Sequence, residues 1–130
     1  IQSQLVTMGY QIVAITPDQP ADIQKTLDKN KLTYTIYSDS DFAAIKAFGV
    51  GYRVSKEMLE KSRGYGITLP QLQDASGAGL PVPSVFIIDG KGIVQFVYVN
   101  PDYRIRLSSE LLLTAARTSL SVKPLQPPTK

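Results

Sequence analysis

The 130-residue sequence contains no cysteine and no histidine. The chain itself therefore forms no disulfide, and it offers no thiolate, no imidazole for acid–base catalysis and none of the usual zinc ligands. Long apolar runs are also missing. None approaches the roughly 20 residues that span a bilayer, so we expect no contact with a membrane. These absences leave few kinds of chemistry open, and we expect neither a metal nor another cofactor in this chain.

Charge of one sign is not concentrated anywhere in the sequence. The net charge is only +3, and the basic residues are dispersed without an accompanying nucleic-acid motif. This pattern indicates a solvated surface of mixed charge, so we expect no nucleic-acid partner. The hydrophobic fraction of 43% and the charged fraction of 19% are ordinary for a globular domain.

The sequence also lacks an initiating methionine and a visible targeting signal. It begins with Ile1, and its first residues read as the middle of a helix. We therefore interpret the chain as a piece of a longer gene product, and we expect a cytoplasmic location for it.

The first half alternates between helical and strand-like segments. Residues 2–8 have helical character, residues 10–15 form a β-branched run typical of a strand covered on both faces, and residues 21–30 carry apolar side chains four apart. A second strand is predicted over residues 33–37, and apolar side chains spaced by three then mark a short helix over residues 42–48. This alternation predicts an α/β fold.

The second half begins irregularly and then regains order. Residues 55–63 favour a helix, but glycine and proline dominate up to Pro83 and predict a long loop. Residues 84–88 and 93–99 read as two strands of an antiparallel hairpin. Ser108 can cap a final helix, and residues 123–130 are predicted to form a flexible tail.

Three passages are distinctive in combination. Residues 80–92 read LPVPSVFIIDGKG, residues 12–18 read IVAITPD, and residues 38–41 and 47–50 read SDSD and AFGV. In this order they resemble the AhpC/TSA family of peroxiredoxin-like proteins, and the resemblance covers most of residues 10–120. It implies an α/β, thioredoxin-like (truncated) domain over residues 1–122, which lacks its first strand and its cysteine motif. It also implies a mixed sheet with a carboxy-terminal β-hairpin and flanking helices.

The resemblance also implies a mechanism. In the family, a reactive cysteine lies at the amino terminus of a helix, where backbone N–H groups and the helix dipole favour the thiolate. The thiolate attacks a peroxide or exchanges with a disulfide, and a thiol reductant restores it. Residues 1–8 would be the far end of that helix, so the cysteine is expected upstream of Ile1.

Four residues are expected beside the redox site. Pro83 matches the cis-proline of the thioredoxin fold, which abuts the cysteine motif and leaves the backbone of the preceding residue, Val82, free for an extended partner. A proline at the start of a strand explains Pro83 as well. Thr16 and Pro17 should end their strand near the same face, although simple strand termination explains them equally well.

Arg106 is a candidate on the substrate side of that site. Typical peroxiredoxins carry an arginine just before the strand equivalent to residues 85–88, where this chain has Pro83 and Ser84. Arg106 follows later, in a stretch that resembles the start of the family's closing helix. An exposed or salt-bridged surface arginine is the alternative. This departure leaves peroxide reduction and thiol–disulfide chemistry both open.

Two other patterns carry no chemistry. Asp39 and Asp41 could bind a hard cation in principle, but capping of the next helix is the favoured interpretation. Gly49 and Gly51 lack the further glycine and the strand-to-helix context of a dinucleotide-binding loop.

Two functions follow from the sequence. The first is a thiol-dependent oxidoreductase or antioxidant domain, inactive in this chain because the thiol is absent. The second is a redox-silent thioredoxin-fold module that binds protein partners through its sheet edge or its long loop. Loss of a central strand would also leave two apolar edges unpaired. We therefore expect those edges to pair directly, or a second molecule to fill the position in a homodimer or strand-swapped oligomer.

Overall fold

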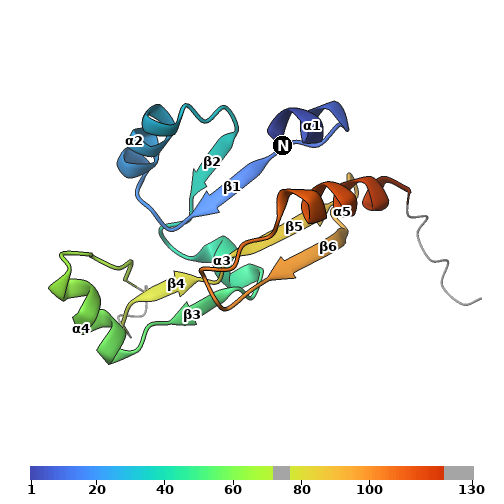
Figure 1. Ribbon diagram of the computed structural model, residues 1–130. Helices are drawn as coiled ribbons and strands as arrows, with labels where there is room; N and C mark the ends of the chain where they lie inside the picture. Colours follow the sequence, from blue (N-terminus) through green and yellow to red (C-terminus); the bar gives the residue numbers. More distant parts are fainter. Residues whose placement is uncertain (72–76, 122–130) are drawn as a thin grey trace, which may run out of the picture.

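A computed structural model describes residues 1–71 and 77–121 of the chain (Figure 1). The expected tail over residues 123–130 lies outside the described residues. Small sheets and helices alternate, as expected for a partial thioredoxin-like fold. In chain order the elements are α1 (Gln2–Thr7), β1 (Val13–Thr16), α2 (Pro20–Asn30), β2 (Thr35–Ser38), α3 (Ala43–Ala47), β3 (Gly51–Arg53), α4 (Lys56–Gly64), β4 (Gly79–Pro81), β5 (Ser84–Ile88), β6 (Val94–Val99) and α5 (Ser109–Ser121).

The strands of the described residues form three separate pairs. β1 and β2 are parallel, and their register runs from Val13 opposite Thr35 to Thr16 opposite Ser38. β3 with β4 and β5 with β6 are antiparallel pairs. The prediction of one mixed sheet is wrong for this chain, because no strand in the described part connects β1 to β5 by hydrogen bonds.

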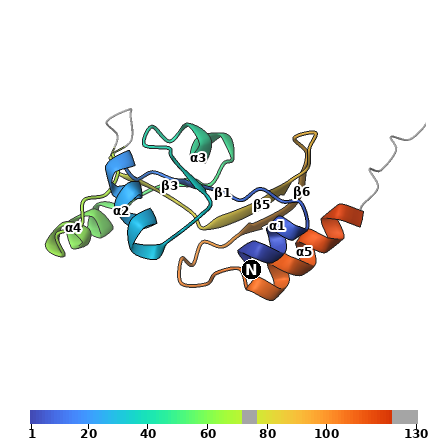
Figure 2. The same cartoon turned by 90° about the horizontal axis from the view of Figure 1, so that it is seen from above.

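The positions of β1 and β5 test the prediction that these two strands pair directly. Figures 1 and 2 show them on neighbouring paths and running in opposite directions, so that the end of β1 and the start of β5 lie at the same end of the molecule. The only strand bonded to β1 is β2, and the only strand bonded to β5 is β6, within residues 1–71 and 77–121. Direct pairing is therefore wrong, and each strand keeps one free edge.

The larger core cluster lies where α1 and α5 meet the β5–β6 pair. Leu5 from α1, Ile87 from β5 and Ala116 from α5 are buried together, and Figure 2 shows the two helices side by side. Ala116 has no exposed surface. Its side chain is small, so the neighbouring elements can pack closely against α5 at this position. The Tyr10 hydroxyl donates to the carbonyl of Ala116 at 2.8 Å, which ties the segment before β1 to α5.

A second, smaller unit comprises β3, α4 and β4. Its own cluster contains Val54, Leu69 and Ala78, and the Ser55 hydroxyl caps α4 by accepting the N–H of Met58 at 3.2 Å. Figure 1 shows this unit projecting away from α1 and α5. The sequence predicted only a loop after α4. That prediction is wrong at β4, because the glycine and proline of so short a strand suppress the usual strand pattern.

Two aspartates stabilise connections that follow β-strands, one between β2 and α3 and one between β5 and β6. Asp39 is 6% exposed, and its carboxylate accepts the N–H groups of Ala44 and Ile45 at 2.9 and 2.8 Å, at the start of α3. Asp89 accepts the N–H groups of Lys91 and Ile93, both at 2.9 Å, between β5 and β6. Asp39 therefore acts as a helix cap, as the sequence analysis favoured.

Candidate functional site

Thr16 and Pro17 lie where β1 ends, and both are half-buried. The Thr16 hydroxyl donates to a carboxylate oxygen of Asp18 at 2.8 Å, and the Thr16 carbonyl accepts the N–H of Asp39 at 2.7 Å. The polar groups of Thr16 are thus used within the turn that follows β1. Neither residue lines the two pockets described below, which lie beside Pro83 and between α1 and α5.

Val82 and Pro83 precede β5 and are also half-buried. The peptide bond between them is trans, because the described residues contain no cis peptide bond. The cis-proline interpretation is therefore wrong in this structure, and trans is the isomer that X–Pro bonds ordinarily favour. The backbone of Val82 is also engaged, since its N–H donates to Val50 at 2.7 Å and its carbonyl accepts the Ser84 hydroxyl at 2.7 Å.

Pro83 and Arg106 lie together on one pocket. The pocket has a volume of about 160 Å³ and lies where the start of β5 meets β6 and the segment before α5. Figures 1 and 2 show the connection from β6 to α5 returning past the start of β5, which explains how residues 23 positions apart in the sequence meet. The lining comprises Pro83, Ser84, Val85, Tyr98, Arg106, Leu107 and Leu112.

The polar groups around this pocket differ in how they are satisfied. Asp102 forms a two-point ion pair with Arg104, and both N···O distances are 2.8 Å. The hydrogen bonds from the Arg104 side chain and backbone lower the pKa of Asp102 and keep that carboxylate charged. Arg106 makes no hydrogen bond or ion pair with any residue in 1–71 or 77–121. The nearby acid is thus committed to Arg104, and the exposed Arg106 guanidinium keeps its donors free of the described residues.

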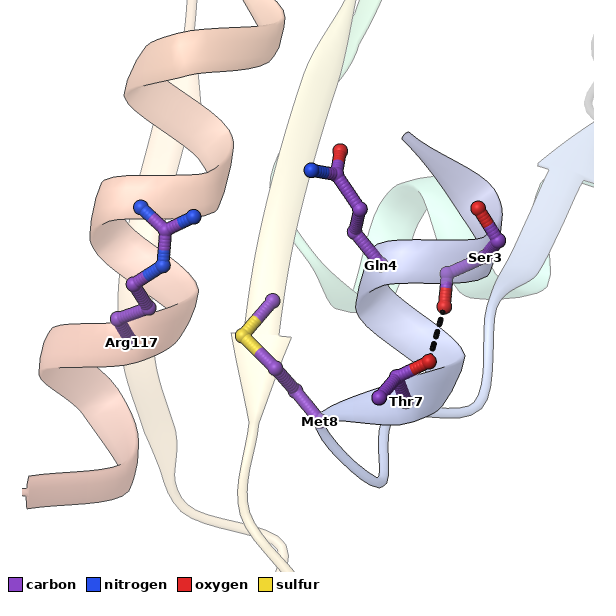
Figure 3. Close-up of a pocket in the computed structure, with 5 residues that line it drawn as sticks. All are labelled: Ser3, Gln4, Thr7, Met8 and Arg117. Carbon is purple, nitrogen blue, oxygen red and sulfur yellow. Dashed lines mark hydrogen bonds between the residues drawn. The ribbon is translucent and has the colours of Figure 1, made fainter.

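A larger pocket of about 270 Å³ lies between α1 and α5 (Figure 3). Figure 3 shows the Met8 side chain pointing from the end of α1 toward α5, with Gln4 above it, while the Arg117 side chain lies along α5. The Thr7 hydroxyl donates to the Ser3 carbonyl at 2.9 Å, so its hydrogen is used and its oxygen remains an acceptor. The lining contains one charged group, Arg117, and no group that could act as a general base.

The pocket beside Pro83 contains no carboxylate, and the whole chain contains no cysteine and no histidine. No group of three potential metal ligands occurs in residues 1–71 and 77–121. Over the same residues, no helix has the length and apolar character needed to cross a membrane.

Sequence reasoning missed two polar residues of the Pro83 pocket, Ser84 and Tyr98. The register of the β5–β6 hairpin would have pointed to Tyr98, because it pairs Tyr98 with Val85, another residue of this pocket. Its hydroxyl accepts the side-chain amide of Asn100 at 3.3 Å, at the rim where β6 ends. Side-chain alternation along the two strands, taken with the turn between them, could have identified this residue.

Comparison with known proteins gives the family. Residues 2–97 match the model of the AhpC/TSA family. This match covers well over half of the chain, and the chain belongs to the AhpC/TSA family. The family is one of thiol-dependent peroxidases and redoxins, so the resemblance found in the sequence is confirmed. A search of curated proteins found no match.

Proposed function

We propose that this chain is the scaffold of a thiol-dependent oxidoreductase or antioxidant domain, whose reactive cysteine lies outside residues 1–130. The observation that carries the proposal is the family match over residues 2–97. The chain alone is inactive in this proposal, since it contains no thiol. A thiol reductant is the partner that turnover requires, and the reduced thiol pools of the cytoplasm suit that role.

The free edges of β1 and β5 support the same proposal. Each strand pairs on one side only within the described residues, and the ends expected beside the redox site lie at the same end of the molecule. An added strand between them would complete a continuous sheet and deliver its own carboxyl end near Thr16 and Pro83. We propose that a cysteine-bearing segment occupies this position, from the same longer chain or from a second molecule.

The chemistry would proceed at sulfur. The thiolate attacks one oxygen of a peroxide, the O–O bond breaks, and the products are a sulfenic acid and an alcohol or water. A second thiol then condenses with the sulfenic acid to give a disulfide and water. With a disulfide substrate the thiolate attacks one sulfur and displaces the other as a thiolate. Arg106 is proposed on the substrate side of either reaction.

The test begins with the nucleotide sequence immediately upstream of the codon for Ile1. We expect a cysteine codon a short helix before Gln2. The longer chain is then expressed with and without replacement of that cysteine by serine, and consumption of hydrogen peroxide and of a small disulfide is measured. Residues 1–130 alone provide the thiol-free control. Absence of an upstream cysteine, or equal turnover by the serine variant, would overturn the proposal.

A redox-silent interaction module is the second candidate, and the β3–α4–β4 unit favours it. This unit exposes large apolar side chains, with Tyr65 at 73% and Ile67 at 53%. Tyr52 and Met58 add to the exposed apolar surface. Such side chains on a projecting unit are typical of protein-binding surfaces. This function requires that the longer chain have no upstream cysteine, so the same sequence determination separates the two candidates.

A further inference from the structure

We propose that the pocket beside Pro83 binds a short monocarboxylate, with Arg106 as the recognition residue. The proposal rests on the proposed function in one respect: it takes the pocket beside Pro83 as the substrate side of the redox site and names the class of substrate bound there. It goes further by assigning binding to a carboxylate group and not to the peroxide or disulfide bond that reacts. The chemistry of the pocket has three parts: a free cation, an apolar floor and two hydroxyl groups.

The free cation is the guanidinium of Arg106. It has five N–H donors in a fixed plane, which match the two oxygens of a carboxylate. Arg104, two residues earlier, is already paired with Asp102 at 2.8 Å, so its paired donors are not available to a ligand carboxylate. The pocket lining contains no acidic residue that could neutralise Arg106 from within. An incoming anion therefore meets one uncommitted positive charge.

The apolar floor selects for a carboxylate with a hydrocarbon portion. Pro83, Val85, Leu107 and Leu112 contribute carbon surface to the lining. A free inorganic anion would gain nothing from that surface, whereas an alkyl chain would be removed from water there. The volume of about 160 Å³ is below that of ordinary drug-sized pockets and restricts the ligand to a short chain.

The hydroxyl groups of Tyr98 and Ser84 would orient a bound ligand. Tyr98 accepts a hydrogen bond from Asn100 at 3.3 Å, which leaves the phenolic hydrogen available to donate. Ser84 donates to the Val82 carbonyl at 2.7 Å, so its oxygen remains an acceptor. The Tyr98 hydroxyl is consequently the second donor for a carboxylate oxygen beside Arg106, and Ser84 suits a neutral polar group further along the ligand.

The experiment is a titration of isotopically labelled residues 1–130 with sodium butyrate, followed by amide chemical shifts. Butyramide, which has the same shape without the charge, is titrated in parallel. We expect saturable shifts for Val85, Tyr98 and Leu107 with butyrate, and at least a tenfold weaker response with butyramide. Arg106→Gln should weaken butyrate binding at least tenfold, and Arg106→Lys should weaken it less, because lysine keeps the charge but loses the planar pair of donors.

A matched variant makes the result specific. Arg117→Gln removes the cation of the α1–α5 pocket and should bind butyrate as the unchanged chain does. Equal binding of butyramide, unchanged affinity in Arg106→Gln, or shifts centred on Met8 and Arg117 would overturn the proposal. The titration needs no thiol. A chain that binds no butyrate leaves the redox proposal standing, and a longer protein without cysteine leaves this pocket standing.

Discussion

At the scale of single residues, Asp39 is the most consequential polar side chain in the described core. It is buried, and its two carboxylate oxygens each accept a backbone N–H at the start of α3. Replacement by alanine leaves both donors without a partner, so Asp39→Ala should lower the free energy of unfolding by about 1–3 kcal/mol. Urea unfolding followed by circular dichroism measures this change.

Asp41 provides the matched control for Asp39. It is exposed, and one of its oxygens accepts the N–H of Ala43 at the longer distance of 3.3 Å. Asp41→Ala should therefore cost well under half as much as Asp39→Ala. Equal effects of the two substitutions would show that the buried pair of hydrogen bonds does not stabilise α3.

Asp89 gives the chain a stabilisation that depends on pH. Hydrogen bonds from the backbone N–H groups of Ile93 and Lys91 lower its pKa below the ordinary value of 3.8. A carboxyl with a depressed folded-state pKa stabilises the fold above its ordinary pKa, and this stabilisation is lost as the pH falls through the folded-state value. Asp89→Asn should thus be less stable than the unchanged chain at pH 7, with the difference shrinking below a pH of about 4. Urea midpoints at several pH values test this, and a constant difference would contradict it.

At the scale of elements, one hydrogen bond connects the segment before β1 to α5. Tyr10→Phe removes the 2.8 Å bond to Ala116 and should cost about 0.5–1.5 kcal/mol of stability at neutral pH. Burial raises the pKa of Tyr10, so the unchanged chain keeps this contribution below pH 10 and loses it as the pH rises through the folded-state pKa. Thermal unfolding at neutral and alkaline pH measures both effects. Tyr103→Phe, at a site 62% exposed, should change neither.

Most elements could be predicted from the sequence because their signals are local. Pro20 in a first helical turn, Ser55 and Ser108 as caps and the apolar alternation of residues 93–99 each act within a few residues. The pairing of β3 with β4 could not be predicted, since its two strands are three residues each and are separated by 25 positions. In the candidate site, Pro83 and Arg106 line one pocket, and their roles beside a redox site stay predictions. Tyr98 was not named in advance, because its place depends on a register that only the folded hairpin fixes.

At the scale of the whole molecule, β1 leaves much of its apolar surface in water. Val13 and Ile15 of this strand remain 47% and 45% exposed. Apolar strand residues left in water favour association with another chain.

The exposed edge of β1 predicts self-association of this chain. Sedimentation velocity over a wide range of concentration should detect a dimer or larger species that dissociates on dilution. Ile15→Lys should weaken the association, because a lysine on an edge strand opposes pairing with a second strand. Val6→Lys, on an exposed position of α1, is the matched control and should leave it unchanged. A chain that stays monomeric at every concentration would rule out the homodimer and the strand-swapped oligomer.

The hydrogen bond between Val82 and Val50 has a consequence for how this molecule can vary. The two residues flank the β3–α4–β4 unit, and their backbone atoms are 2.7 Å apart. Everything between them thus leaves and rejoins the rest of the chain at nearly one point. A segment attached in this way can be lengthened, shortened or exchanged for another with little effect on the elements outside it, since the closing distance stays the same. Relatives of this chain could accordingly share the Pro83 pocket and the α1–α5 core while differing greatly in what projects from them.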